Sequence, residues 1–309
     1  MVDFTSLSGI YWYIALSLIL IIFVVSGFYL SGIVIFPNTK TREETLQTEC
    51  EKGNMSGSDF DILPKEEVII RSIYGYELHG LYFPKVNSKK TVIICHGITY
   101  TIYGSVKYME IFNKRGYNVF IYDHRNHGDS GGKNTTFGYY EKYDLKRCTD
   151  WVFERCGNDC TVGIHGESMG AAIALQNIAI DPRVSFCIAD CPFSDLTKLF
   201  KYRFRVEYKL PAFPAFQITC LFARLRTGMR IKDISPIRDI SNLETPIFFI
   251  HGREDLYIPT QMSIDMYSSK KGTSRLYLAP NARHAEAVVK NGEEYDRLVG
   301  EFLKEIGCE

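Results

Sequence analysis

A long stretch without charged residues near the amino terminus constrains this chain more than any other feature. Residues 4–39 contain no Asp, Glu, Lys or Arg, and the run from Ile10 to Phe36 consists largely of Ile, Leu, Val, Phe and Tyr. A helix that crosses a bilayer needs about 20 apolar residues, whereas a signal peptide has a basic residue before a shorter apolar run and a small-residue cleavage site after it. We therefore predict a single uncleaved transmembrane anchor at residues 10–36, behind a flank at residues 1–9. A cleaved signal peptide and a buried helix are the alternatives.

The charges that flank the apolar run indicate its orientation. Lys40, Arg42 and Lys52 follow the run, whereas Asp3 is the charged side chain before it. Cytoplasmic flanks carry the excess of Lys and Arg, so the carboxyl-terminal side is predicted to be cytoplasmic. The nine cysteines are odd in number and form no C-x-x-C pair, which is typical of reduced thiols. We expect a single-pass cell-membrane protein with its main domain on the cytoplasmic side.

The rest of the composition is that of a folded globular domain. The 36 basic and 36 acidic residues cancel, so no net positive field is available to hold a nucleic acid. Hydrophobic residues make up 46% of the chain and charged residues 23%, which is enough for a sizeable core. Residues 37–65 are polar, and we interpret them as a linker between the anchor and a domain at residues 66–309.

Short apolar runs alternate with longer amphipathic ones from residue 66 onward. Runs such as TVIIC, NVFIY and PIFFI are typical of strands buried on both faces of a parallel sheet. We predict strands at residues 67–73, 77–83, 91–95, 118–122, 161–165, 184–189, 246–250 and 274–278, and helices at 105–115, 140–155, 169–180, 260–268 and 286–306. The alternation predicts an α/β fold with a doubly wound, mostly parallel eight-stranded sheet, whose sites lie beyond the carboxyl ends of the strands.

Residues 192–243 interrupt this alternation and predict a helical cap. The stretch from Phe193 to Arg230 mixes Phe, Leu and Tyr with Lys and Arg, and Pro211 and Pro214 should divide it into two helices. Such a mixture fits a helical lid over the core, and it also fits an interfacial helix that contacts lipid. Both alternatives stay open at this stage.

A G-x-S-x-G motif at residues 166–170 lies between a predicted strand and a predicted helix. The glycines permit a sharp turn that presents Ser168, and the start of the following helix offers backbone N–H groups to a developing oxyanion. Ser168 is therefore the candidate nucleophile, and the backbone N–H of Met169 is the first candidate oxyanion donor. A helix-capping serine is the alternative interpretation.

A serine nucleophile needs a base, which an acid orients. Where G-x-S-x-G turns occur in such sheets, the order along the chain is serine, acid, histidine. Of the seven histidines only His251 and His284 follow Ser168. His251 directly follows a predicted strand, whereas His284 lies in a loop before the last predicted helix. His284 is therefore the candidate base, with a solvated loop histidine as the alternative.

Asp255 is the favoured acid because it lies in the loop after the seventh predicted strand, one helix and one strand before His284. Asp190, at the end of the sixth predicted strand, could also reach the histidine and is the main rival. Glu254 competes more weakly. A triad is defined by geometry, so the sequence only ranks these three carboxylates.

The loop after the third predicted strand should supply the second oxyanion donor. We expect the backbone N–H of Ile98 to be that donor, with the N–H of Met169 as its partner. A metal site formed by His96, Asp123, His124 and His127 is the alternative use of this region, but the spacing matches no usual ligand pattern. We predict neither a metal nor a cofactor.

Five motifs, in this order along the chain, resemble the α/β-hydrolase superfamily. They are HG at residues 96–97, DHRNHG at 123–128, GESMG at 166–170, HGREDLYIP at 251–259 and RHAEA at 283–287. More narrowly, residues 66–306 are similar to the membrane-anchored bacterial serine hydrolases described as lysophospholipase-like or serine-aminopeptidase-like. The resemblance implies an α/β-hydrolase fold and hydrolysis of an ester, thioester or amide without a cofactor. It does not specify the substrate.

The sequence is compatible with three functions. The favoured one is a serine hydrolase, a carboxylesterase or lysophospholipase-like enzyme, that acts on a small-molecule or lipid ester through an acyl-enzyme. A serine peptidase or amidase would need an acidic pocket, for which the predicted cap offers Glu207 and Asp195. A non-catalytic, membrane-tethered binding protein would have lost a triad residue, and the sequence retains all three. Because a linker separates the motifs from the anchor, we expect removal of residues 1–40 to preserve hydrolysis of short esters.

Overall fold

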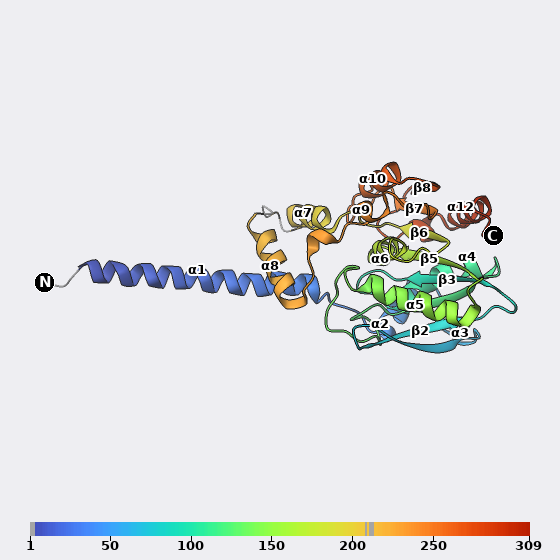
Figure 1. The fold of residues 1–309 in the computed structure, drawn as a ribbon, viewed down its shortest axis with the longest axis horizontal. Coiled ribbons are helices and arrows are strands. Elements are labelled where there is room, and N and C mark those ends of the chain that lie inside the picture. Colours follow the sequence, from blue (N-terminus) through green and yellow to red (C-terminus); the bar gives the residue numbers. More distant parts are fainter. Residues whose placement is uncertain (1–3, 208, 210–212) are drawn as a thin grey trace.

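One mixed sheet forms the centre of the molecule in a computed structural model that describes residues 4–207, 209 and 213–309 (Figure 1). Its strand order is β1-β2-β4-β3-β5-β6-β7-β8, with β1–β2 and β2–β4 antiparallel and the other pairs parallel. The strands are β1 (Glu66–Arg71), β2 (Glu77–Phe83), β3 (Lys90–Cys95), β4 (Asn118–Tyr122), β5 (Thr161–Glu167), β6 (Phe186–Asp190), β7 (Ile247–Gly252) and β8 (Ser274–Ala279). The predicted eight-stranded, mostly parallel sheet is confirmed.

Helices cover both faces of the sheet, because its central strands are apolar on both sides. Ile93 of β3 faces one core cluster, whereas its neighbours Val92 and Ile94 face the other, as the alternation of side chains along a strand requires. Helices α5 (Glu141–Cys156) and α6 (Met169–Ile178) contribute to the first cluster. The second cluster receives residues from η1 (Ile102–Tyr108), α4 (Met109–Asn113), α11 (Ala287–Lys290) and α12 (Gly292–Glu305).

The last predicted helix, at residues 286–306, is divided in the structure into α11 and α12. Asn291 stands between them with φ −134° and ψ 40°, outside the helical region, and Gly292 follows it. Asn and Gly are the residues that most readily leave helical geometry, so this break has a local cause. The helix α10 (Gln261–Ser269) matches its prediction to within one residue.

Between Phe193 and Arg230 the described residues of the cap form two helices, the number expected from the prolines. Helix α7 (Leu196–Val206) begins at Asp195, whose side chain accepts a hydrogen bond from the Lys198 N–H, and helix α8 (Ala215–Thr227) begins after Pro214. Pro211 lies outside the described residues. A short 3-10 turn, η2 (Ile231–Asp233), and the helix α9 (Pro236–Ile240) lead back to the sheet.

Residues 37–65 were expected to form a linker, but they pack against the domain. They contain α2 (Arg42–Glu51), which starts with a capping box between Thr41 and Glu44, and α3 (Gly57–Asp61). The side chain of Arg42 donates a hydrogen bond to Asp123, and Phe60 is buried in the second core cluster. This segment is therefore a folded layer, held by a buried ion pair and an aromatic side chain.

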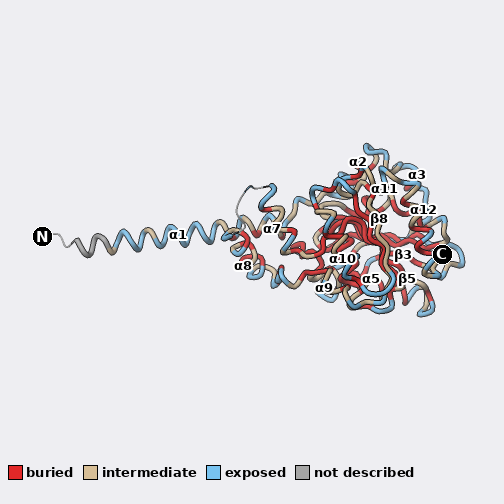
Figure 2. The backbone as a smooth tube through the Cα atoms, turned by 90° about the horizontal axis from the view of Figure 1, so that it is seen from above, coloured by how far each residue is buried: buried red, intermediate tan, exposed pale blue. Residues whose placement is uncertain are grey.

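The apolar amino-terminal run forms the helix α1 (Phe4–Ile35), which projects from the domain (Figure 1). The stretch Gly9–Ile35 is long and apolar enough to cross a membrane, and only 17% of its most apolar window is buried. Most of this helix is exposed in Figure 2, and in the part next to α8 only Gly27, Ser31 and Ile35 are buried. Such exposure of Ile, Leu and Phe differs from that of a core helix in a water-soluble domain.

The carboxyl-terminal half of α1 packs against the cap. The Phe222 ring of α8 contacts the rings of Phe23 and Phe28 at centroid distances of 5.7 and 5.4 Å. Arg226 Nη1 donates hydrogen bonds to the Phe28 carbonyl and to Ser31 Oγ, each over 2.9 Å. The expectation that the anchor and the domain are separated by a linker is therefore wrong.

Candidate active site

Ser168 occupies a strained turn between β5 and α6. Its φ of 56° and ψ of −116° lie in a region that residues with a Cβ rarely adopt. The turn is possible because Gly170 lies against β3, where an added Cβ would stand 2.3 Å from the Cys95 carbonyl oxygen. Ser168 precedes α6, but its side chain makes no capping hydrogen bond. The hydroxyl is thus available for another partner.

That partner is His284. Ser168 Oγ lies 2.9 Å from His284 Nε2, and His284 Nδ1 lies 2.7 Å from Asp255 Oδ2. A carboxylate only accepts hydrogen bonds, so Nδ1–H donates to Asp255 and Nε2 is left to accept from the serine hydroxyl. His284 comes from the loop between β8 and α11, and Asp255 from the loop after β7. The structure brings the three sequence-predicted residues into one hydrogen-bonded series.

Asp255 is surrounded by donors that favour its ionised form. Its side chain is fully buried, and Oδ1 accepts hydrogen bonds from the backbone N–H groups of Tyr257 and Ile258. Burial raises the pKa of this carboxyl, but hydrogen bonds from His251 and His284 outweigh it and hold the pKa well below its ordinary value. Asp255 therefore stays charged and fixes the orientation of the imidazole.

The two predicted oxyanion donors lie beside Ser168. Ile98 and Met169 line the same cavity as the serine, and Met169 is the first residue of α6, where backbone N–H groups have no partner within the helix. Within residues 4–207, 209 and 213–309, no acceptor is found for the N–H of either residue. The neighbouring Thr99 has a φ of 69°, and its N–H donates to His127 Nε2, which shapes the loop.

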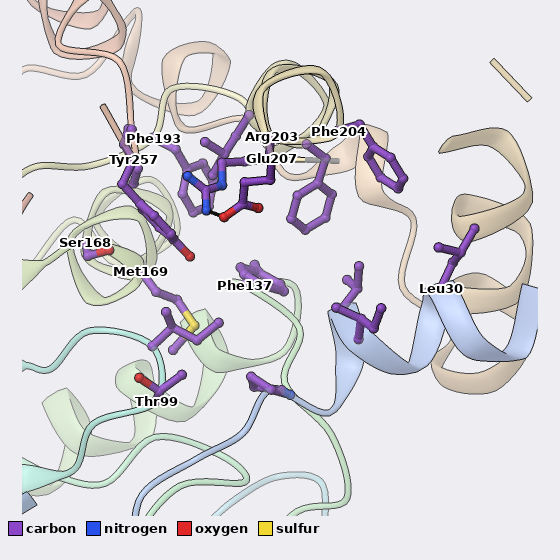
Figure 3. Close-up of a pocket in the computed structure, with 17 residues that line it drawn as sticks. Leu30, Thr99, Phe137, Ser168, Met169, Phe193, Arg203, Phe204, Glu207 and Tyr257 are labelled. Carbon is purple, nitrogen blue, oxygen red and sulfur yellow. Dashed lines mark ion pairs between the residues drawn. The ribbon is translucent and has the colours of Figure 1, made fainter. Parts of the chain in front are cut away.

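Ser168 opens into an apolar cavity of about 320 Å³ beneath the cap. Figure 3 shows the cavity between Ser168 at one end and Leu30 of α1 at the other. The cap helix α7 covers it with Arg203 and Phe204, and Glu207, the residue that follows α7, also lines the cavity. Arg203 forms an ion pair with Glu207 and lies over the Tyr257 ring, 3.8 Å from its centroid. The volume and the apolar lining are typical of small-molecule sites.

Comparisons with known proteins agree with this architecture. Residues 86–220 match the family described as "Serine aminopeptidase, S33". Over 279 residues the chain is 39% identical to the uncharacterized protein YqkD of Bacillus subtilis, and the match covers 90% of this chain and 92% of that protein. The chain belongs to the α/β-hydrolase superfamily.

Two further similarities concern named enzymes. An esterase of Pyrococcus furiosus is 30% identical with a TM-score of 0.67, covering 82% of this chain and 95% of that one. The lysophosphatidylserine lipase ABHD12 of Macaca fascicularis is 26% identical over 189 residues, which cover 59% of this chain but 46% of that protein. The chain is thus an α/β hydrolase of the esterase/lipase type.

The rival acids of this α/β hydrolase lie away from the histidine. Asp190 is fully buried, and its Oδ2 accepts a hydrogen bond from Tyr108, which also donates to Glu167. Burial, together with the nearby charge of Glu167, raises the pKa of Asp190 to about 7. Glu254 is exposed. Among the described residues, Asp255 is the carboxylate that contacts His284.

Two of the three histidines considered for a metal site, His96 and His127, instead use their rings in hydrogen bonds that shape the hydrolase loops. His96 Nε2 accepts the backbone N–H of His124, and His127 Nδ1 lies 2.8 Å from the Arg125 carbonyl. Asp123 accepts the side chain of Arg42 and the N–H of Ile102. In the part of the chain that is described, three potential ligand atoms come within 4.8 Å of one another only at Cys191, Asp255 and His284.

His251 is a site residue that sequence reasoning missed. Its Nε2 lies 3.0 Å from both Asp255 Oδ2 and the Ile258 carbonyl, so it carries the proton and donates to these acceptors. Nδ1 then accepts from the hydroxyl of Ser263, 2.8 Å away. His251 therefore contacts the same carboxylate oxygen of Asp255 as His284 does and helps to hold that carboxylate in place. The HGRED sequence gave a signal for this, because it places a buried strand-end histidine four residues before the acid.

Proposed function

We propose that this chain is a serine hydrolase that cleaves an acyl ester through an acyl-enzyme intermediate. The observation that carries the proposal is the hydrogen-bonded series from Ser168 through His284 to Asp255, at the wall of an apolar cavity. A serine hydroxyl becomes a useful nucleophile when a neutral histidine can take its proton, and a buried carboxylate fixes that histidine in the required tautomer.

The reaction divides into two steps. Ser168 Oγ attacks the ester carbonyl while its proton moves to His284 Nε2, and the N–H groups of Ile98 and Met169 stabilise the resulting oxyanion. Collapse breaks the bond to the alcohol, which leaves with the proton from His284. Water then attacks the acyl-enzyme with His284 as base, so that a carboxylic acid and free Ser168 are formed.

An ester fits the cavity better than a peptide with a free amino terminus. Such a peptide needs an unpaired carboxylate, but Glu207 is paired with Arg203 and Asp195 caps α7. The remaining lining is largely apolar. A peptidase is the alternative that the family description favours, and a binding protein without catalysis is the third possibility.

We further propose that α1 anchors the enzyme in the cell membrane. The exposed apolar surface of the helix supports this, as do Leu221 and Leu225, which α8 exposes beside it. A cleaved signal peptide fits less well because Ser31 and Ile35 are fully buried against the domain. From the Lys40 and Arg42 flank we propose the cytoplasmic side for the catalytic domain.

A substrate panel on the full chain in detergent micelles tests the proposal. We expect hydrolysis of p-nitrophenyl butyrate and octanoate, with aminoacyl p-nitroanilides cleaved at least about a hundredfold more slowly. Ser168→Ala serves as the control for contaminating esterases, and Ser194→Ala as the matched substitution of a buried serine outside the triad. Preferred cleavage of the anilides would identify a peptidase, and inactivity on both substrate classes would support the binding protein.

A further inference from the structure

The apolar helix α1 is part of the wall of the candidate active site. Leu30, Ile33 and Val34, together with Pro37 just after the helix, line the cavity that contains Ser168. In Figure 3 Leu30 lies on α1 at the far end of the cavity from Ser168, and Phe137 lies between them. A helix expected only to attach the protein thus supplies one end of the space next to the nucleophile.

This wall is fixed to the domain at several points. Ile35 is fully buried, and its carbonyl accepts the backbone N–H of Thr135 over 2.9 Å. The N–H of Lys40 donates to the carbonyl of Thr99, in the loop next to the candidate oxyanion donor Ile98. Contacts of α1 with α8, including the bond from Arg226 to Ser31, hold the helix from the other side. The end of α1 therefore has a defined position relative to Ser168.

The same helix continues from the cavity as an exposed apolar surface. Ile33 lines the cavity and is still 43% exposed, and towards the amino terminus Tyr29, Val25 and Ile22 are exposed by 69%, 61% and 64%. If α1 spans the bilayer, this surface lies in lipid, and the cavity lies at the membrane boundary. A hydrocarbon chain can then pass from lipid to the cavity along one apolar helix without entering water.

We propose that α1 forms the distal part of an acyl-chain site, which takes the hydrocarbon chain of an ester that resides in the bilayer. This inference rests on the proposed function, because it assumes that Ser168 attacks the ester carbonyl. The carbonyl lies at Ser168 and the chain extends past Phe137 towards Leu30. The charged groups of the lining, Arg203 and Glu207, neutralise each other, so the described wall presents no unpaired charge to the chain.

Chain-length selectivity in paired variants of the full chain tests the proposal. The measured quantity is the ratio of kcat/KM for p-nitrophenyl decanoate to that for p-nitrophenyl butyrate, in micelles of one detergent. Each buried methylene contributes up to about fourfold, so Leu30→Trp, which fills the distal end, should lower the ratio at least about tenfold. Tyr13→Trp introduces the same side chain at an exposed position further towards the amino terminus of α1, outside the cavity lining, and its ratio should stay within about twofold of the wild type.

Leu30→Ala distinguishes a change in the length of the acyl-chain site from a general packing defect. Removing the side chain enlarges the distal end, so the chain length with the highest kcat/KM should increase, whereas a packing defect would lower kcat/KM for all esters alike.

Photocross-linking locates the acyl chain in the wild-type enzyme directly. An alkyl fluorophosphonate with a terminal diazirine is attached to the enzyme and then photolysed. Cross-links should appear in the peptide that contains residues 30–37.

The possible results distinguish failure of the acyl-chain site from failure of the proposed esterase function. Equal ratios in Leu30→Trp and Tyr13→Trp, or cross-links confined to α7, would overturn the acyl-chain site while leaving the esterase intact. Absence of ester hydrolysis in the wild-type protein itself would instead overturn the proposed function.

Discussion

The ring of Phe222 in the cap helix α8 lies directly against Gly27 of the helix α1. A Cβ atom at residue 27 would stand 2.2 Å from that ring, so the contact requires glycine. Ser31 and Ile35 follow at intervals of four residues and are fully buried, which places all three on one face of α1. The cap therefore packs on the apolar helix along a stripe that begins with small residues, a pattern also found where membrane helices associate.

Gly27→Leu should separate α8 from α1. Overpacking of a close contact costs about 1–3 kcal/mol, so the thermal unfolding midpoint in micelles should fall. Gly9→Leu is the matched control, because a Cβ at residue 9 meets no atom within 4 Å and the gain in helix propensity is the same. Equal midpoints for the two variants would mean that the contact contributes nothing to stability.

Exchanging each candidate acid for its amide identifies the one that orients His284. Asp255→Asn should lower turnover by about ten-thousandfold, as in a related triad, because an amide cannot hold Nδ1 in its protonated tautomer. Asp190→Asn should retain turnover within about tenfold, since Asp190 contacts Tyr108 instead of the histidine. Steady-state hydrolysis of p-nitrophenyl butyrate measures both. The reverse order would assign the acid to Asp190.

The buried carboxyl of Asp190 should make stability depend on pH. Its pKa rises from 3.8 to about 7, mainly through burial, so between these values the folded protein holds a proton that the unfolded chain has released. The contribution of this group to stability is then largest at low pH and falls as the pH rises through this window, by up to about 4 kcal/mol. Between pH 5 and 7.5, Asp190→Asn should show a smaller fall in thermal midpoint than the wild type. An identical fall would contradict the raised pKa.

The contacts of α1 and Lys40 with the site reverse the expectation from the sequence, so that deleting residues 1–40 should impair hydrolysis even of short esters. The deletion removes the cavity wall at Leu30 and Val34 and the hydrogen bond from Lys40 to Thr99, beside the candidate oxyanion loop. Displacements of about 1 Å can cost about a hundredfold, so we expect kcat/KM for p-nitrophenyl acetate to fall about 10- to 100-fold. Deletion of residues 1–21 keeps the contacts with α8 and should retain activity. Full activity in the longer deletion, with unchanged circular dichroism, would show that the wall is dispensable.

Much of the fold and the grouping of the site residues could be predicted from the sequence. The central strands β3 to β7 are buried on both faces, and the apolar runs along the sheet predicted most strand boundaries to within two residues. Ser168, Asp255 and His284 follow three strands whose carboxyl ends share one edge of the sheet, which is why their chain positions indicated one site. Their catalytic roles stay predictions until they are measured.

The position of α1 could not be predicted, because a helix that is apolar on every side gives no periodic signal for the face that packs on protein. Only the spacing of Gly27, Ser31 and Ile35 marks that face, and this spacing is a weak signal in isolation.

The helix α2 was missed for a different reason. The capping box of Thr41 and Glu44 was present, but the ten residues of α2 are polar and resemble a linker until Arg42 pairs with the buried Asp123.

Covalent labelling tests the central claim, that Ser168 is the nucleophile, most directly. The full chain in micelles is treated with a fluorophosphonate and digested, and the modified peptide is located by mass spectrometry. We predict one adduct on Ser168, its absence in Ser168→Ala, and undiminished labelling in the control Ser194→Ala. An adduct on any other residue of the wild-type protein, or labelling that persists in Ser168→Ala, would contradict the account.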